Sequence, residues 1–340
     1  MSKIEQKPSF AVCYACDDNY EMFAAISMLS LFENNPDTGS YIVMVLGDNL
    51  SKKTQCHFKE LAAEHHCEIL ICNVHERLEW MKNNGCTSKV ANSSMAAYSR
   101  LFFQEFIPPD VKRVLYIDCD TIVNSDISDL HSFDMKDNVI AALWDVIPVK
   151  YNEILGVSKR NHYFNSGVML IDCKKWINGK YQLKITTHLV EHFGKYMYCD
   201  QDVLNIVLDG KAAPLPPEYN FFPHFQQFTP AQTRYLMDAD EDWYYTDAQF
   251  EKAKNCPRII HYGYAFTGRP WVKGNLNELT YKWDEYLSKS IYRDYIKKKE
   301  PLDKRIIVRV LYKICPRGIF VRFYKMKNFR WMKADMYDKK

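Results

Sequence analysis

Short apolar runs alternate with segments of helical periodicity over the N-terminal part of the chain. Buried strands are expected at residues 10–16, 41–46 and 68–72, where most side chains are apolar. Between them, residues 20–32 carry apolar positions at helical spacing, and a second helix is expected at residues 51–66 with a serine as its N-cap. Strands and helices that alternate in this way predict an α/β fold with a mostly parallel sheet covered on both faces.

The same pattern continues through the middle of the chain, where it becomes more aromatic and less regular. A helix is expected at residues 95–106, where two prolines follow it, and a strand at residues 114–117 comes next. Two further strands are expected at residues 139–144 and 167–171, and another helix at residues 197–208. No internal repeat or low-complexity segment interrupts this order.

Two carboxylates follow the strand at residues 114–117. Asp118 and Asp120 are separated by one residue, so on an extended backbone their side chains point to the same side and can reach one ion. Hard oxygen ligands suit Mg²⁺ or Mn²⁺, which usually complete their shell with water and phosphate. The alternative is structural, because aspartate also favours turns and helix N-caps.

A second polar cluster, Asp17-Asp18-Asn19, follows the first expected strand. In open α/β sheets ligands bind outside the carboxyl ends of the strands, and both clusters fall there. The chain has 12 glycines, and neither a G-x-G-x-x-G nor a P-loop pattern occurs among them. A bound phosphate therefore has to be held by a metal and by cationic side chains.

Length and composition limit the class of protein. The 340 residues, of which 47% are hydrophobic, suffice for one large domain with appendages or for two domains. The first ten residues lack the apolar stretch of a signal peptide, and no apolar run is long enough to predict a transmembrane helix. We therefore expect a cytosolic protein. Its 11 cysteines are scattered and are expected to act as small hydrophobic residues, including the pair Cys13 and Cys16.

The C-terminal segment, residues 302–340, is strongly basic. It contains 12 Lys or Arg and 3 Asp, whereas the rest of the chain is net acidic. Aromatic residues such as Phe329 and Trp331 occur in it, and one expected helical face carries Ile306, Ile307, Val310, Leu311 and Ile314. Basic and aromatic residues without spanning length favour a segment that lies on an anionic membrane surface. The alternatives are a helix pair packed on the domain and, third, a nucleic-acid-binding arm, which no recognisable nucleic-acid-binding fold accompanies.

Six short blocks carry a resemblance to a known family. In chain order they read ACDDNY (15–20), AYSRL (97–101), VLYIDCD (114–120), YFNSGVMLID (163–172), DQDVLN (200–205) and HYG with RPW (261–271). Together they resemble glycosyltransferase family 8, the retaining enzymes similar to bacterial lipopolysaccharide galactosyltransferases. The resemblance spans roughly residues 10–281. It implies a GT-A fold, a nucleotide-sugar donor that is usually UDP-linked, and Mn²⁺ or Mg²⁺.

The resemblance also implies a role for each matching residue. Asp118 and Asp120 match the metal ligands, and His261 matches the third, although a lone histidine ending a strand is more often structural. Asp17 and Asn19 match the residues that bind uracil, and Arg100 matches a residue directed at the diphosphate and donor sugar. The full set of implied substrate contacts is Ala15, Asp17, Asn19, Arg100, Cys119, Asn165, Asp200, Gln201, Gly263 and Arg269.

Several of these residues have a structural alternative. Asp17 could form an Asx turn, and Arg100 could be a solvated residue on its helix. Asn165 could be a turn residue, and Asp200 or Asp202 could cap the following helix.

The last block departs from the family pattern. Arg269 stands where a lysine is common, in a slightly longer loop. Arginine can still bind a diphosphate bidentately. Which atoms of the donor Arg269 and Gly263 contact stays open.

The implied catalytic residues are Arg100, Asp200 and Gln201. Gln201 is an amide and therefore a poor nucleophile, which favours a same-face, oxocarbenium-like substitution over two displacements. We expect residues 1–285 to form the catalytic domain and residues 286–340 a membrane-associating tail. The predicted function is transfer of galactose or glucose from a UDP-sugar to a glycan or glycolipid acceptor at the inner face of the membrane.

Other functions stay open at this point. A nucleotide-sugar hydrolase and a non-catalytic sugar-nucleotide-binding protein are the alternatives. Deletion of residues 302–340 is expected to abolish vesicle binding and to leave donor hydrolysis intact.

Overall fold

The chain is described by a computed structural model. The described residues are 8–86, 95–158, 161–192, 197–263, 266–299 and 304–337. Residues 1–7, which bear on the expected lack of a signal peptide, lie outside this part, as do the side chains of Phe329 and Trp331.

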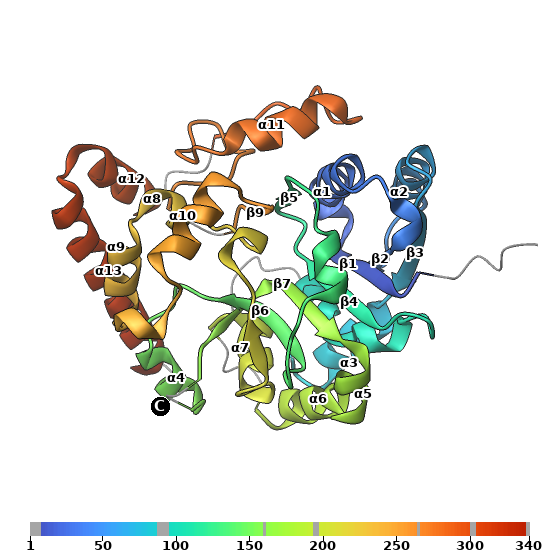
Figure 1. Cartoon of the computed structure of the whole chain (residues 1–340), viewed down its shortest axis with the longest axis horizontal. Helices are drawn as coiled ribbons and strands as arrows, with labels where there is room; N and C mark the ends of the chain where they lie inside the picture. Colours follow the sequence, from blue (N-terminus) through green and yellow to red (C-terminus); the bar gives the residue numbers. More distant parts are fainter. Residues whose placement is uncertain are drawn as a thin grey trace, which may run out of the picture.

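The main sheet contains seven strands in the order β3-β2-β1-β4-β7-β6-β8 (Figure 1). Neighbouring strands are parallel except at β7, which runs antiparallel to both β4 and β6. A second, two-stranded antiparallel sheet pairs β5 with β9. The strands are β1 (Phe10–Cys16), β2 (Ile42–Gly47), β3 (Glu68–Asn73), β4 (Arg113–Ile117), β5 (Thr121–Val123), β6 (Ile140–Trp144), β7 (Phe164–Asp172), β8 (Ala212–Pro214) and β9 (Ile259–His261).

Helices cover both faces of the main sheet, with α1 and α2 on one side and α3, α5, α6 and α7 on the other (Figure 1). The α-helices are α1 (Glu21–Asn34), α2 (Lys52–Glu64), α3 (His75–Asn83), α4 (Lys150–Leu155), α5 (Cys173–Asn178), α6 (Tyr181–Glu191), α7 (Cys199–Val207), α8 (Pro223–Gln227), α9 (Pro230–Met237), α10 (Asp247–Asn255), α11 (Thr280–Lys289), α12 (Lys304–Ile314) and α13 (Arg317–Tyr337).

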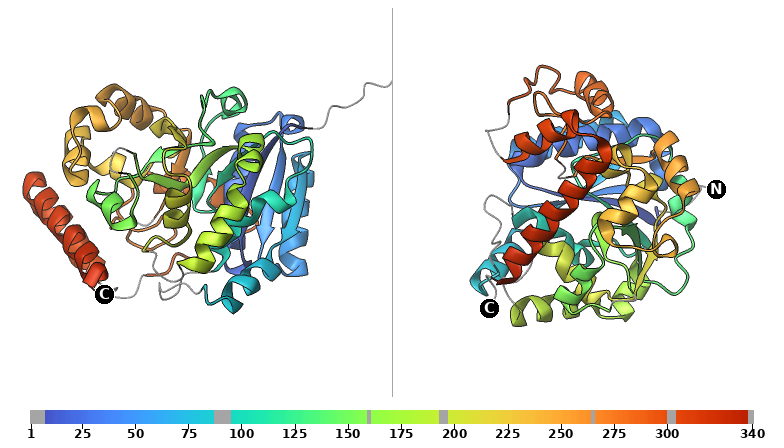
Figure 2. Two further views of the ribbon diagram at one scale, coloured as in Figure 1. Left: turned by 90° about the horizontal axis from the view of Figure 1, so that it is seen from below. Right: turned by 90° about the vertical axis from the view of Figure 1, so that its left-hand side faces the viewer.

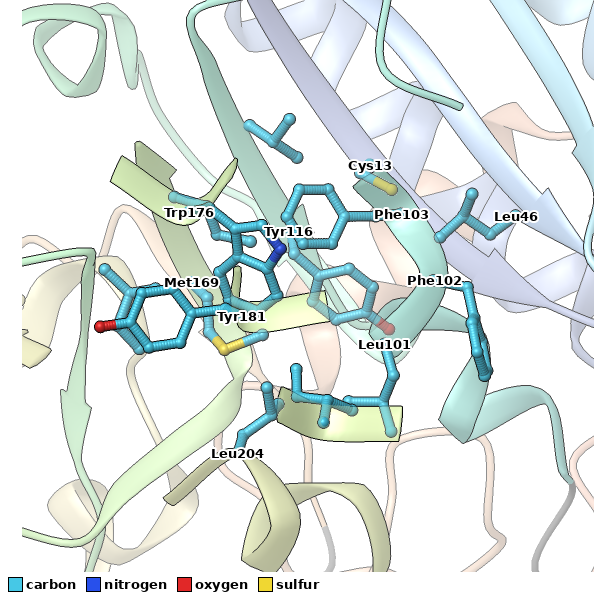
Figure 3. Packing of buried hydrophobic residues seen from close by; sticks show 14 of the residues in the cluster. Cys13, Leu46, Leu101, Phe102, Phe103, Tyr116, Met169, Trp176, Tyr181 and Leu204 are labelled. Atoms are coloured by element: carbon cyan, nitrogen blue, oxygen red, sulfur yellow. The ribbon is translucent and has the colours of Figure 1, made fainter. Parts of the chain in front are cut away.

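Two apolar clusters, one on each face of the sheet, form the core. Side chains along β1 alternate between them, as the two-residue period of a strand requires. Figure 3 shows part of the cluster that includes Trp176 of α5 and Phe103. Trp176 packs edge-on against Phe103, with ring centroids 4.9 Å apart. Trp176 and Phe103 are both almost fully buried, so this contact fixes α5 against the segment Met95–Phe106, which also carries Arg100.

The predicted α/β fold with a mostly parallel sheet is confirmed, and the first strands and helices lie within a few residues of their predicted bounds. The helix expected at residues 95–106 is present with the predicted bounds. Met95–Phe106 is a 3₁₀ helix, buried on most sides between the sheet and the helices around it. The tighter 3₁₀ form is a feature that the apolar spacing alone did not specify.

The last two helices, α12 and α13, form what we call the C-terminal hairpin, and it packs beside α9 (Figure 2). Val308, Phe320, Val321 and Tyr324 are buried in one cluster with Phe266, with Phe228 directly after α8, and with Leu236 of α9. Packing of a helix pair on the domain, one of the alternatives considered above, is therefore present. The expected boundary between residues 285 and 286 falls inside α11, and the division into domain and tail stays a prediction.

The other face of the hairpin leaves apolar side chains in solvent. The exposed ridge consists of Ile307, Val310, Ile314, Ile319, Phe323 and Met326, with exposed fractions between 39% and 70%. The face expected to be uniformly apolar is thus divided, because Leu311 packs on the buried cluster while Ile307 and Ile314 do not. Within the part of the chain that the structure describes, none of the helices is both long and apolar enough to cross a membrane.

Candidate active site

Two aspartates and a histidine meet at the carboxyl end of β4. Asp118 directly follows β4, Asp120 directly precedes β5, and β9 ends at His261, opposite Thr121 of β5. Nε2 of His261 lies 3.2 Å from Oδ1 of Asp120 and 3.7 Å from Oδ2 of Asp118. One ligand atom from each residue lies within 4.8 Å of the others. Two carboxylates and an imidazole are a donor set that fits Mn²⁺.

The charges of this group depend on one another. Burial alone raises the pKa of Asp120, but His261 and Arg269 hold that pKa well below its usual range. Burial alone lowers the pKa of His261, but the Asp120 carboxylate raises it above its ordinary value. A metal ion bound here would replace the proton on His261 as the positive charge between the ligands.

The ring of His261 is oriented by neighbours outside the ligand group. Its Nδ1 lies 2.9 Å from Oδ1 of Asn220, and Nδ2 of Asn220 donates to Oδ1 of Asn165 at 2.9 Å. Donation from Nδ1 to Asn220 leaves Nε2 as the ligand atom. Gly167 lies against the ring, and a Cβ there would come within 2.2 Å of Cε1 of His261 and 2.7 Å of Oδ2 of Asp118. The ligands approach so closely because residue 167 has no side chain.

Arg100 is buried behind the ligands, with 8% of its surface exposed. Its Nη2 lies 2.7 Å from Oδ1 of Asp118, and its Nε lies 3.0 Å from Oδ2 of Asp200. Nη1 donates to the carbonyl oxygen of Ser166 at 2.8 Å, and the guanidinium stacks over the ring of Tyr116. The alternative of a solvated arginine is therefore wrong. Arg100 lies between two carboxylates and is ion-paired with both.

Asn165, Gln201 and Asp145 form a buried hydrogen-bonded group beside the ligands. Nδ2 of Asn165 donates to Oε1 of Gln201 at 3.0 Å and to Oδ2 of Asp145 at 3.1 Å. Nε2 of Gln201 donates to the same oxygen of Asp145 at 2.9 Å. Burial raises the pKa of Asp145. Asn165 lies inside β7 and is not a turn residue, so that alternative is also wrong.

The two aspartates at the start of α7 have different roles. Asp202 accepts hydrogen bonds from the hydroxyl groups of Tyr151 and Tyr163 and from the backbone N–H groups of Met197 and Tyr198. It therefore holds the beginning of the helix, as one of the two was expected to do. Asp200 faces Arg100 instead, and burial raises the pKa of Asp200 to about 6 in spite of that cation.

Arg269 reaches the ligands from the loop after β9. Its Nη2 lies 3.3 Å from Oδ2 of Asp120, and its Nη1 donates to the hydroxyl of Tyr20 at 3.4 Å. Gly263 lies near the same group, since a Cβ there would lie 3.4 Å from Nε2 of His261. Arg269 is therefore next to a carboxylate of the ligand group, and Gly263 is next to its histidine.

The expected uracil-binding residues lie at the end of β1. Oδ1 of Asp17 accepts from the backbone N–H of Asn19 at 3.0 Å and of Tyr20 at 3.2 Å, which is the Asx turn considered as an alternative. Cys119 lies between the two metal-ligand candidates, and its Sγ lies 3.2 Å from the carbonyl oxygen of Ala15. This contact joins the part of the site that is expected to bind uracil to the part that is expected to bind the metal. The binding roles of these residues stay predictions.

Asp145, Gly167 and Asn220 are site residues that were not predicted from the sequence. Asp145 directly follows β6, so the rule that drew attention to the ends of β1 and β4 could have found it. Gly167 and Asn220 carry no such signal, because their importance depends on distances across the folded chain.

This fold and the cluster of two carboxylates and a histidine define a GT-A type of protein, and comparison with known proteins gives the family. The family model "Glycosyl transferase family 8" matches residues 11–274. The chain therefore belongs to glycosyl transferase family 8, and the resemblance stated above is confirmed.

Relatives and solved structures agree with this assignment. The chain is 28% identical over 285 residues to lipopolysaccharide 1,2-glucosyltransferase of Escherichia coli K12, covering 80% of this chain and 81% of that protein. It is 26% identical over 224 residues to lipopolysaccharide 1,3-galactosyltransferase of Salmonella typhimurium, covering 62% and 63%. The structure of galactosyltransferase LgtC with donor and acceptor sugar analogues shares the fold, with a TM-score of 0.66, 24% identity and coverage of 83% of this chain and 96% of that chain.

Proposed function

We propose that this protein is a metal-dependent, retaining hexosyltransferase that moves galactose or glucose from a UDP-sugar to a lipopolysaccharide, capsule or glycolipid type of acceptor. The observation that carries the proposal is the convergence of Asp118, Asp120 and His261 on one small volume. The names of two relatives, a lipopolysaccharide glucosyltransferase and a galactosyltransferase, support this type of acceptor and both hexoses.

Asp118, Asp120 and His261 would hold Mn²⁺ or Mg²⁺, which supplies Lewis-acid stabilisation to the departing UDP. Arg269 contacts Asp120 and could bind the diphosphate through two N–H groups. Arg100 forms an ion pair with Asp118 and, as the family resemblance implies, would be directed at the donor sugar. Asp17 and Asn19 offer a carboxylate and an amide that can pair with uracil.

Retention of configuration requires either two displacements or a substitution on one face of the sugar. Gln201 presents an amide, which is a weak nucleophile, and Asp200 is paired with Arg100. Both oxygens of Asp145 are also occupied, because Oδ1 accepts from the N–H of Val146 and Oδ2 accepts from two side-chain amides. We therefore propose same-face substitution, in which an oxygen of the donor phosphate takes the proton of the acceptor hydroxyl.

The test is release of UDP from a panel of UDP-sugars with and without Mn²⁺, using Asp120→Asn as the metal-site variant. We expect release from a UDP-hexose that needs both the metal and Asp120. Analysis of the sugar product separates transfer from hydrolysis, because a hydrolase yields only free hexose. No metal-dependent release with any donor and acceptor, in spite of measurable UDP binding, would favour a non-catalytic binding protein.

We also propose that the C-terminal hairpin docks on the anionic inner face of the cell membrane. The exposed ridge can enter the lipid boundary, and the net positive charge of residues 302–340 matches an anionic lipid surface. The triple variant Ile307→Ser, Ile314→Ser and Ile319→Ser changes three exposed residues.

The triple variant should lose binding to vesicles that contain phosphatidylglycerol and should keep its thermal stability. Unchanged vesicle binding would refute membrane docking through this face. Neutral phosphatidylcholine vesicles are the control for charge.

A further inference from the structure

The C-terminal hairpin contacts the loop that carries Arg269. Arg309 of α12 donates from Nε to the carbonyl oxygen of Phe266 at 2.7 Å. The ring of Phe266 lies among aromatic rings of the hairpin, with centroid distances of 5.0 Å to Tyr312, 5.4 Å to Phe320 and 5.2 Å to Tyr324. The loop is thus anchored to the hairpin through one backbone carbonyl and one buried ring.

The contact continues from Phe266 towards the metal ligands. Gly268 has φ of +83°, and a Cβ there would lie 2.8 Å from Nη2 of Arg309, so the guanidinium packs directly on this turn. The next residue is Arg269, whose side chain reaches Oδ2 of Asp120 at 3.3 Å. Gly268, on which Arg309 packs, is therefore the immediate neighbour of the residue whose side chain contacts a metal-ligand candidate.

We propose that Arg309 is a positioning residue that fixes the Phe266–Arg269 turn, so that the C-terminal hairpin sets the position of Arg269 over the donor diphosphate. This inference rests on the proposed function, because it assigns Arg309 an effect only through Arg269. The hydrogen bond of Arg309 to Phe266 holds the backbone that presents Arg269.

One consequence concerns the whole tail. Deletion of residues 302–340 would remove Arg309 and uncover the apolar cluster around Phe228 and Phe266. Donor hydrolysis in solution is then expected to fall, in contrast to the earlier expectation that it would persist. Substitutions on the exposed ridge test the membrane proposal without this complication.

The experiment compares Arg309→Ala, Arg309→Lys and Lys313→Ala in the full-length protein. Lys313 is the matched control because it lies one turn later on α12, is exposed and carries the same charge. For Arg309→Ala we expect the KM for the UDP-sugar to rise about tenfold, as loss of one charge-assisted hydrogen bond allows, while the Kd for Mn²⁺ stays unchanged. Lys313→Ala should match the wild type in both quantities. Partial recovery of the donor KM in Arg309→Lys would support the hydrogen bond to Phe266 as the cause.

Hydrogen exchange over residues 266–272 gives a readout that does not depend on turnover. Faster exchange there in Arg309→Ala, but not in Lys313→Ala, supports the proposal. If Arg309→Ala equals Lys313→Ala in donor KM and in exchange while Arg269→Ala still weakens donor use, the positioning role is refuted and the proposed function stands. If Arg269→Ala has no effect either, the proposed role of Arg269 fails and the inference fails with it.

Discussion

Replacement of Gly167 by alanine tests the geometry of the metal-ligand group with a single methyl group. No left-handed φ applies at Gly167, so alanine can adopt the same backbone and the effect is purely steric. Its Cβ would lie 2.2 Å from Cε1 of His261, whereas ordinary contact begins at 3.4 Å. The imidazole therefore has to retreat by about 1 Å, and the same methyl group presses on Oδ2 of Asp118.

A displacement of this size is large for a coordinated ligand. Misplacement by about 1 Å can cost about 10²-fold in function, and loss of outer partners of a ligand costs about 10–100-fold in metal affinity. We expect the Kd of Gly167→Ala for Mn²⁺ to rise about 30- to 100-fold, which corresponds to about 2 to 3 kcal/mol. Metal-dependent UDP release should fall in parallel at limiting Mn²⁺.

Isothermal titration with Mn²⁺ measures the first quantity, and UDP release over a range of Mn²⁺ concentrations measures the second. Gly39→Ala is the control, because a Cβ there meets only a side-chain oxygen of Asp37 at 3.9 Å. Circular dichroism establishes that both variants fold. If folded Gly167→Ala binds Mn²⁺ as tightly as the wild type, His261 is not held at the distance from which this reasoning starts.

Three further predictions concern other parts of the site and the core. Burial raises the pKa of Asp200 to about 6, so Asp200 loses its charge as the pH falls through 6, and Arg100 then loses one of its two carboxylate partners. We expect kcat/KM to fall with pH in this range, and we expect Asp200→Asn to remove that dependence. Asn220→Ala should weaken Mn²⁺ binding about tenfold or more in calorimetry, because Nδ1 of His261 loses its acceptor. Trp176→Ala should lower the free energy of unfolding by about 3–5 kcal/mol in urea titrations, since it empties a fully buried site; a loss under 1 kcal/mol would contradict the packing described.

The ends of the strands were predictable from the sequence, and so was much of the site. Asp118 and Asp120 follow an apolar run, and that local pattern was enough to place them at the edge of the sheet. The approach of His261 was not predictable from the pattern, because β5 and β9 are only three residues long and show no useful period. It was expected only through the family resemblance.

The pattern of apolar and polar residues also did not determine which side chains are buried or which charged side chains pair with one another. Arg100 stands beside three apolar residues in a segment that reads as an amphipathic helix, which leaves a solvated cation possible. Its pairing with Asp118 and Asp200 depends on contacts between elements distant in the chain. The hairpin was similarly ambiguous: its helical period showed an apolar face but not which residues of that face the domain covers.

The short pairing of β5 with β9 has a consequence for the order of events during synthesis. Thr121 pairs with His261, and the backbone N–H of Tyr262 donates to the carbonyl oxygen of Asp120 at 2.8 Å, so the two halves of the ligand group join across a long stretch of chain. A ribosome-bound chain that ends before β9 carries both aspartates but lacks the third ligand. Under the proposed function, tight Mn²⁺ binding would therefore be a signature of completed long-range pairing, and retention on a metal-loaded column would separate native molecules from truncated or misfolded ones.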